Sequence, residues 1–91
     1  MGLLPLKMAV LVTISANSNV TLNTIMDILK DDYGTEKQFN EKNFSHLLHA
    51  LKAVGLIERC GIIVSEQNEV CEQYKITEAG MNYVKSFPQN H

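Results

Sequence analysis

Six side chains between residues 42 and 52 have the types and the spacing that contact with nucleic acid requires. They are Lys42, Asn43, Ser45, His46, His49 and Lys52. Lysine neutralises phosphate charge, while serine and asparagine can bond base edges in the major groove of DNA. Positions three, four and seven residues apart share one face of a helix, with Asn43 at the flank of this face. The spacing therefore predicts a DNA-binding helix face, and an ordinary solvated helix face is the alternative.

The charge distribution favours DNA binding in one segment and opposes it in the next. The chain has 91 residues and a formal net charge of −2, so any positive footprint must be local. Residues 37–59 hold four positive and two negative charges, a sum of +2, whereas residues 60–74 hold only Glu66, Glu69 and Glu72. Phosphates would be repelled by this acidic segment. Binding of another protein is therefore the alternative function.

Two histidines and two cysteines raise the question of a metal site. His46 and His49 lie one helical turn apart, and Cys60 and Cys71 follow within the next segment. Zinc accepts such ligands, but the closely spaced cysteine pair typical of zinc sites is missing. Buried, inert and reduced cysteines are the simpler interpretation, so no metal and no cofactor is predicted. The chain also lacks a nucleophile elbow and a glycine-rich phosphate loop, which argues against an enzyme.

The candidate face needs a helix whose opposite side is held in a core. Apolar residues recur at helical spacing on that side, at Phe44, Leu47, Leu48, Leu51 and Val54. Asn40 is suited to the N-cap position, and Gly55 supplies the left-handed residue with which many helices end. A helix over residues 40–54 is predicted.

A hairpin and a short helix are predicted after Gly55. Residues 56–64 and 70–76 read as two strands, and the polar segment Ser65–Glu69 joins them. Either Gln67–Asn68 or Ser65–Glu66 can occupy the turn, so the register stays open. Thr77 can cap a final helix that extends to about Phe87, where Pro88 prevents continuation.

The first half of the chain contains one clear helix and one ambiguous segment. Thr21 can cap a helix that carries an apolar stripe and ends at Gly34; the stripe comprises Leu22, Ile25, Met26, Leu29 and Tyr33. The segment Leu3–Ile14 is apolar on nearly every side. Pro5 favours a helix start there, while residues 10–14, of which all but Leu11 are β-branched, favour a strand, and a helix is predicted. Because one small core cannot cover every side of this segment, we expect it to contact a second subunit.

The order of elements in the second half resembles the third helix and wing of winged helix-turn-helix regulators of the MarR and PadR type. Two landmarks carry the resemblance. One is the Gly-Leu-Ile step at Gly55, and the other is the Tyr-x-Ile-Thr-x-x-Gly run from Tyr74 to Gly80. The fold class that this implies is mostly α with a small β hairpin (α+β), as one winged-helix domain over residues 1–91.

The resemblance also implies a function. A protein of this kind is a transcription regulator rather than an enzyme, and it acts as a homodimer that places its third helix in the major groove of double-stranded DNA. No apolar run approaches the ~18 residues that a membrane-spanning helix needs. The apolar run after Lys7 is at the lower limit for a signal peptide, so a cytoplasmic location is expected.

Overall fold

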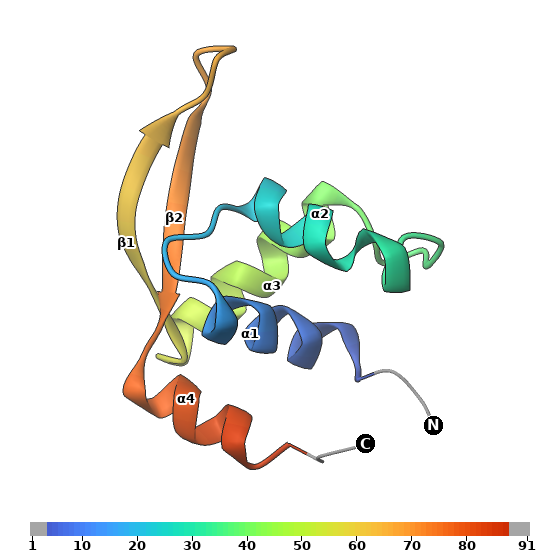
Figure 1. Ribbon diagram of the computed structural model, residues 1–91, viewed down its shortest axis with the longest axis vertical. Coiled ribbons are helices and arrows are strands. Elements are labelled where there is room, and N and C mark those ends of the chain that lie inside the picture. The colour runs from blue at the N-terminus through green and yellow to red at the C-terminus, as the bar shows by residue number, and fades with distance from the viewer. Residues whose placement is uncertain (1–3, 88–91) are drawn as a thin grey trace.

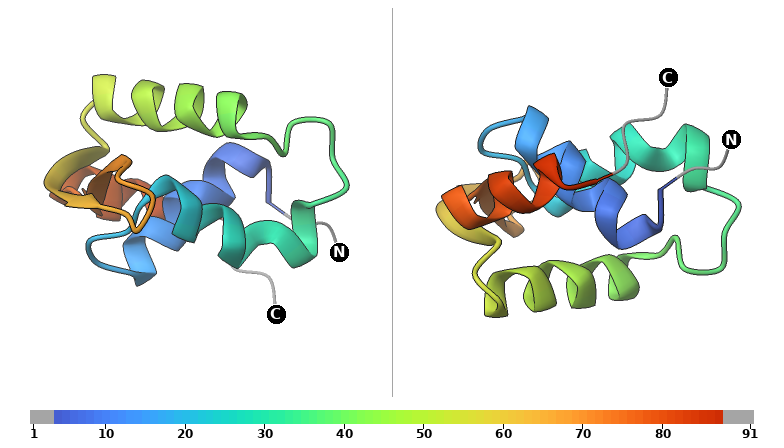
Figure 2. Two further views of the ribbon diagram at one scale, coloured as in Figure 1. Left: turned by 90° about the horizontal axis from the view of Figure 1, so that it is seen from above. Right: turned by 90° about the horizontal axis from the view of Figure 1, so that it is seen from below.

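Residues 4–87 are described by the computed structural model, and they form four helices and one antiparallel hairpin (Figure 1). The helices are α1 (Leu6–Ala16), α2 (Leu22–Tyr33), α3 (Glu41–Ala53) and α4 (Glu78–Lys85), and the strands are β1 (Ile57–Val64) and β2 (Val70–Ile76). The hairpin of β1 and β2, which we call the wing, projects from the helical body. Seen along the long axis, α3 runs along one side of the body and α4 lies against α1 (Figure 2).

α1 passes through the middle of the body and packs against α2, α4 and β2. Its side chains Val10, Leu11 and Ile14 are at most 2% exposed, which explains why the segment is apolar on nearly every side. The strand alternative for residues 10–14 is wrong, because tertiary burial outweighs β-branching here. The chain's own α4 and β2 cover much of the surface that the sequence assigned to a second subunit. Leu3 lies outside the described residues.

The predicted helix starts at Thr21, Asn40 and Thr77 are confirmed. Each side chain accepts a hydrogen bond from the backbone N–H three residues later, at 3.3, 2.8 and 3.0 Å respectively. These bonds satisfy N–H groups that lack a partner at the start of a helix. The amphipathic helices then bury their apolar stripes around one core, in which Ile25 and Phe44 are fully buried.

Gly55 ends α3 in the left-handed conformation that the sequence predicted, with φ of 83°. The Gly55 N–H donates to the Lys52 carbonyl, and the Leu56 N–H donates to the Leu51 carbonyl, both at 3.0 Å. This pair of bonds satisfies the last carbonyls of the helix and turns the chain directly into β1.

The wing turn differs from both alternatives that the sequence left open. The Asn68 N–H donates to the Ser65 carbonyl at 2.9 Å, which places Glu66 and Gln67 at the centre of the turn. Asn68 follows with φ of 63°, a left-handed position that asparagine tolerates. This three-residue connection is a common hairpin type that the sequence pattern did not distinguish.

A β-bulge and an extra bridge shape the base of the wing. The register of the strands shifts between Arg59 and Gly61, so that Cys60 has no direct partner on β2. Val20, which precedes α2, pairs with Tyr74 through two backbone hydrogen bonds of 3.1 and 2.7 Å. The sequence did not predict this bridge, which fixes the wing to the start of α2.

The joint between the wing and α4 explains the second sequence landmark. The Thr77 hydroxyl caps α4 and also donates to the Gly55 carbonyl at 2.7 Å. Gly80 is buried against Leu56, and a Cβ atom at this position would clash with the Leu56 carbonyl and lie 2.7 Å from Ile76. Threonine and glycine are therefore required where α4 meets the end of α3. The helix ends at Lys85, two residues before the predicted end at Phe87, and Pro88 lies outside the described residues.

Candidate nucleic-acid interface

α3 presents five of the six predicted side chains on one exposed face. Phe44, Leu48 and Leu51 are at most 2% exposed and hold the helix against the body. The exposed side chains on the opposite face are Lys42, Ser45, His46, His49 and Lys52. Because the apolar side fixes the rotation of the helix, this face is displayed rigidly to solvent.

Asn43 has a different environment from the other five. It is only partly exposed, and its amide nitrogen donates to the Gln38 carbonyl at 2.9 Å. Asn40 makes a similar bond to the Lys37 carbonyl at 3.0 Å. The two amides fix the turn between α2 and α3 to the start of α3. A bidentate contact of Asn43 with adenine needs both its amide nitrogen and its oxygen, and the bond to Gln38 uses one of the two N–H groups and restrains the orientation of the amide.

Ion pairs on the wing engage one positive and one negative charge of residues 37–59. Arg59 lies 3.1 Å from Glu72, and Lys75 lies 3.5 Å from Glu58. Without the paired Arg59 and Glu58, residues 37–59 still hold three lysines and one glutamate, a sum of +2. On the exposed face of α3, Lys42 and Lys52 supply the positive charge.

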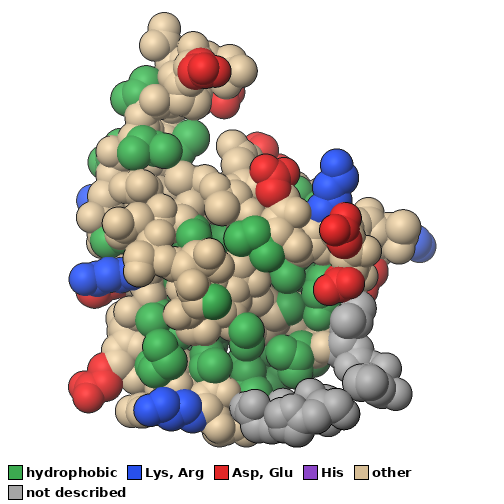
Figure 3. Space-filling view, viewed as in Figure 1, with side chains coloured by type: hydrophobic (Ala, Val, Ile, Leu, Met, Phe, Trp, Pro, Cys, Tyr) green, Lys and Arg blue, Asp and Glu red, His purple; other side chains and the backbone are tan. Residues whose placement is uncertain are grey.

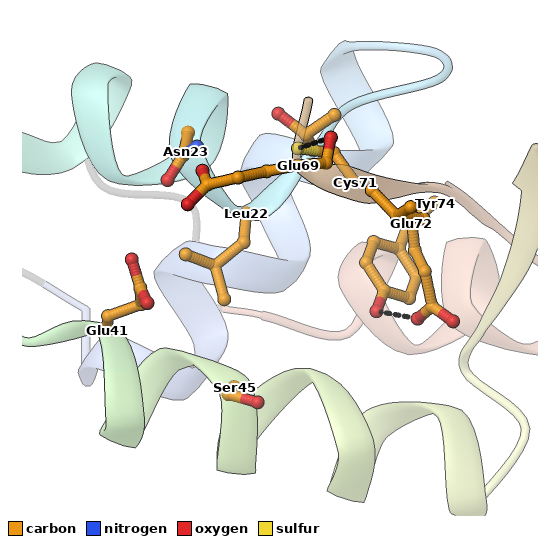
Figure 4. Close-up of a pocket in the computed structure, with 10 residues that line it drawn as sticks. Leu22, Asn23, Glu41, Ser45, Glu69, Cys71, Glu72 and Tyr74 are labelled. Atoms are coloured by element: carbon orange, nitrogen blue, oxygen red, sulfur yellow. Dashed lines mark hydrogen bonds between the residues drawn. The ribbon is translucent and has the colours of Figure 1, made fainter. Parts of the chain in front are cut away.

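A polar groove of about 490 Å³ separates α3 from the wing (Figure 4). It is lined by the start of α2 (Thr21, Leu22, Asn23), by α3 (Glu41, Ser45) and by the wing (Glu69, Val70, Cys71, Glu72, Tyr74). Three of these residues are glutamates. A phosphate backbone is therefore disfavoured inside the groove, and the DNA-binding candidate is the outward face of α3.

Tyr74, Glu72 and Arg59 form a hydrogen-bonded network on the groove side of the wing. The Tyr74 hydroxyl donates to Glu72 at 2.7 Å, and the Arg59 guanidinium donates to the other carboxylate oxygen at 3.1 Å. These two bonds lower the pKa of Glu72, although partial burial opposes the change. Burial and the bond to Glu72 raise the pKa of Tyr74 to about 12. Sequence reasoning missed this network, although the i, i+2 spacing of Glu72 and Tyr74 on a strand indicates a shared face.

The cysteines and histidines are not brought together. Within residues 4–87, no group of three or more histidine, cysteine, aspartate or glutamate side chains has an arrangement that could hold a metal ion. The Cys60 thiol donates to the Asn19 side chain at 3.0 Å, and Cys71 is a free thiol further along the wing. Cys60 is exposed, whereas the sequence suggested that it is buried. It is exposed because β1 projects from the body beyond Ile57, and most residues of this strand are exposed.

Solved structures share this arrangement of elements at low sequence identity. A PadR-like transcriptional regulator from Bacillus cereus is 22% identical, with a TM-score of 0.69 over 88% of this chain and 74% of that chain. Bacillus subtilis PadR, solved in complex with operator DNA, is 17% identical, with a TM-score of 0.73 over 94% of this chain. Streptococcus pneumoniae FabT, solved in complex with DNA, is 20% identical, with a TM-score of 0.63 over 91% of this chain.

The fold is that of a winged helix. The resemblance to PadR-type regulators that the sequence indicated is thus confirmed at the level of the fold, with three helices, a two-stranded wing and a closing helix. This chain spans about half the length of the PadR and FabT chains, at 49% and 50%. No family model matches the sequence, and no curated protein matches it either. Among residues 4–87, no helix is long and apolar enough to cross a membrane.

Proposed function

We propose that this protein is a DNA-binding transcription regulator that inserts α3 into the major groove. The observation that carries the proposal is the rigid, exposed face of α3 with Lys42 and Lys52 near its two ends. Two proteins with the same fold, PadR and FabT, were solved with DNA, which supports this use of the fold.

The side chains of this face have different roles in the proposed complex. Lys42 and Lys52 contact phosphates, and these contacts set affinity without reading sequence. Ser45, His46 and His49 lie between the lysines and reach base edges, where hydroxyl and imidazole groups bond donors and acceptors. The bond of Asn43 to Gln38 leaves its second N–H and its carbonyl oxygen available, but it restrains how the amide can approach a base.

The regulator is proposed to act as a homodimer that forms through the segment Leu3–Ile14 together with α4. A largely apolar groove of about 620 Å³ supports this contact. It is lined by α1 (Lys7, Met8, Leu11), by the end of α3 and the connection to β1 (Leu51, Val54, Leu56), and by α4 and the two residues that follow it (Ala79, Asn82, Tyr83, Ser86, Phe87). Val54 and Tyr83 are 66% and 48% exposed there. A two-fold axis at this surface would set two α3 helices ~34 Å apart, one turn of DNA.

A salt titration with single variants tests the DNA proposal. Affinity for genomic fragments is measured by electrophoretic mobility shift at several salt concentrations, for the parent protein and for Lys42→Ala. Loss of one phosphate contact is expected to lower the slope of log affinity against log salt by roughly one. Lys85→Ala is the matched control, because Lys85 is an exposed lysine on α4, away from the face. An unchanged slope in Lys42→Ala would contradict the proposed interface.

Analytical ultracentrifugation tests the dimer separately. Val54→Glu places a charge in the apolar groove and is expected to shift the protein towards monomer. Ile28→Glu is the control, because Ile28 is 47% exposed on α2 and does not line the groove. A monomeric parent protein at tens of micromolar would refute the dimer.

Binding of another protein is the second candidate function, and the acidic wing favours it. Residues 60–74 contain Glu66, Glu69 and Glu72 and no lysine or arginine. Replacing Glu66 and Glu69 by lysine distinguishes the two functions. If the wing lies near DNA, the substitution raises affinity for all sequences. If the wing instead serves a protein partner, DNA affinity stays unchanged.

A further inference from the structure

The outer half of the wing exposes apolar side chains that nothing in the described chain covers. Ile62, Val64 and Val70 are 54%, 62% and 68% exposed, and Ile63 is 44% exposed. Apolar side chains line the wing beneath an acidic tip (Figure 3). Ile62, Val64 and its partner Val70 share one face of the wing, and an exposed apolar patch of this kind marks a contact site.

The free edge of β1 adds unpaired backbone groups to this surface. The Ser65 N–H donates to the Glu69 carbonyl at 2.8 Å, so Ser65 and Ile63 direct their backbone groups towards β2. By alternation, Ile62 and Val64 direct theirs outward. Within residues 4–87, no other element forms a backbone hydrogen bond with this edge of β1. The other edge of the hairpin belongs to β2, and Val20 pairs there with Tyr74 near the base.

This edge lacks the usual protection against strand pairing. Natural edge strands are protected by lysine, by proline, by a bulge or by short length. Residues 60–65 contain no charged residue and no proline, and the bulge lies at their inner end, next to Arg59. An edge with these properties is suited to pairing with another strand.

We propose that β1 pairs antiparallel with β1 of a second copy of this chain, which joins two wings into a four-stranded sheet. The charges at the two ends of the edge favour this partner. Arg59 lies near the base of β1, and Glu66 lies at the other end, two residues after the strand ends at Val64. Antiparallel pairing reverses one copy, so Glu66 of each copy comes beside Arg59 of the other, and symmetry repeats the contact.

Strand geometry restricts the pairing further. Outward groups must meet outward groups, so Ile62 can lie opposite Ile62 or Val64 of the second copy, and these two registers pair more of residues 60–65 than Val64 opposite Val64 does. Both registers bring Glu66 within one residue of Arg59. Arg59 also binds Glu72 through Nη1, and its guanidinium has further N–H donors for a second carboxylate. Parallel pairing would instead set Glu66 against Glu66 and is disfavoured.

Wing pairing stabilises a hairpin that is marginal by itself, because a two-stranded ribbon needs additional strands or packing to be stable. The contact uses a different surface from the α1–α4 groove and does not depend on that proposed dimer. If both contacts form, two different two-fold interfaces link the chains into an open row. Adjacent DNA sites would then be filled cooperatively.

Mixing two charge-reversed variants tests the proposal. In the paired wings, Glu66→Arg would bring the new arginine of one copy beside Arg59 of the other. Arg59→Glu would bring the new glutamate of one copy beside Glu66 of the other. Each variant is therefore expected to self-associate through the wing about tenfold more weakly than the parent. In the mixture, position 66 of each variant meets an opposite charge at position 59 of the other variant. Sedimentation velocity is therefore expected to show that the mixture associates more strongly than either variant alone. Circular dichroism of each variant confirms that it is folded.

Amide hydrogen exchange identifies the contact at residue level. On raising the concentration of the parent protein, the N–H groups of Ile62 and Val64 are expected to become protected. The N–H of Ile63 already bonds β2 and serves as the internal control. A mixture that associates no better than its components would overturn the proposal, and so would unchanged exchange at Ile62 and Val64. If Glu66→Arg associates as strongly as the parent protein, the apolar side chains of the wing cause non-specific aggregation, and the proposal of paired wings is overturned as well.

Discussion

Gly80→Ala separates the effect of helix propensity from the effect of the packing seen at the α4 joint. By propensity alone, alanine stabilises a helix interior by up to ~1 kcal/mol relative to glycine. The structure predicts the opposite sign. The added Cβ atom would meet the Leu56 carbonyl and lie 2.7 Å from Ile76 Cγ1, whereas carbon contacts are optimal at about 3.5–4.0 Å. α4 must therefore move by about 1 Å.

The magnitude follows from the contacts that this movement disturbs. Overpacking costs about 1–3 kcal/mol, and weakening of the Thr77 cap costs about 1 kcal/mol more. After subtraction of the propensity gain, we expect the free energy of unfolding to fall by about 2 kcal/mol. Chemical denaturation in urea, followed by circular dichroism, should show a midpoint lower by between about 1 and 2 M.

Gly61→Ala is the matched control for this measurement. A Cβ atom at Gly61 would lie 2.6 Å from Gln73 Oε1, which is the end of a flexible side chain that can rotate away. The expected change is under about 1 kcal/mol, the value of the hydrogen bond from Gln73 to Asn19. If Gly80→Ala proves as stable as the parent protein, the packing argument is refuted.

Three further predictions concern the start of α3, the wing network and the cysteines. Asn40→Ala is expected to lower the free energy of unfolding by about 1 kcal/mol in the same assay, because it removes the acceptor for the Asn43 N–H; an unchanged midpoint would refute the cap. Because the pKa of Tyr74 is raised from 10.0 to about 12, its neutral form stabilises the fold below pH 10, and this contribution is lost as the pH rises towards 12. Tyr74→Phe should therefore show a smaller loss of stability over that interval than the parent, and equal losses would count against the raised pKa. Protein purified without added metal is expected to contain no stoichiometric zinc or iron by elemental analysis, with both thiols reactive after denaturation.

Local signals explain why much of the fold could be predicted from the sequence. The caps at Thr21, Asn40 and Thr77 and the stop at Gly55 depend on residues within one turn of each other, so sequence spacing determines them. The exposed face of α3 follows from its apolar stripe in the same way. These features depend on residues close in sequence, so they could be predicted without knowledge of the tertiary contacts.

Features that depend on distant segments could not be predicted. The bridge between Val20 and Tyr74 joins residues far apart in sequence and requires the complete body to bring them together. The pairing of Arg59 with Glu72 requires the bulge at Cys60, and no local pattern marks that bulge. The engaged amide of Asn43 depends on the path of the turn between α2 and α3. In each of these contacts, the tertiary structure determines which residue is the partner.

The wing also makes the two lysines of the proposed interface unequal. Hydrogen bonds from Tyr74 and Arg59 are the largest causes of the lowered pKa of Glu72, and the positive charge of Lys52 contributes further. Glu72 thus attracts the charge of Lys52 weakly, without forming an ion pair with it. Neither Lys42 nor Lys52 has an ion pair within the described residues, so the two differ only in this weak attraction from Glu72. We therefore expect Lys42→Ala to lower the salt slope of DNA binding more than Lys52→Ala does, and a Glu72→Gln substitution in the parent should strengthen binding through Lys52. Equal slopes for the two alanine variants would show that the wing does not influence the end of α3.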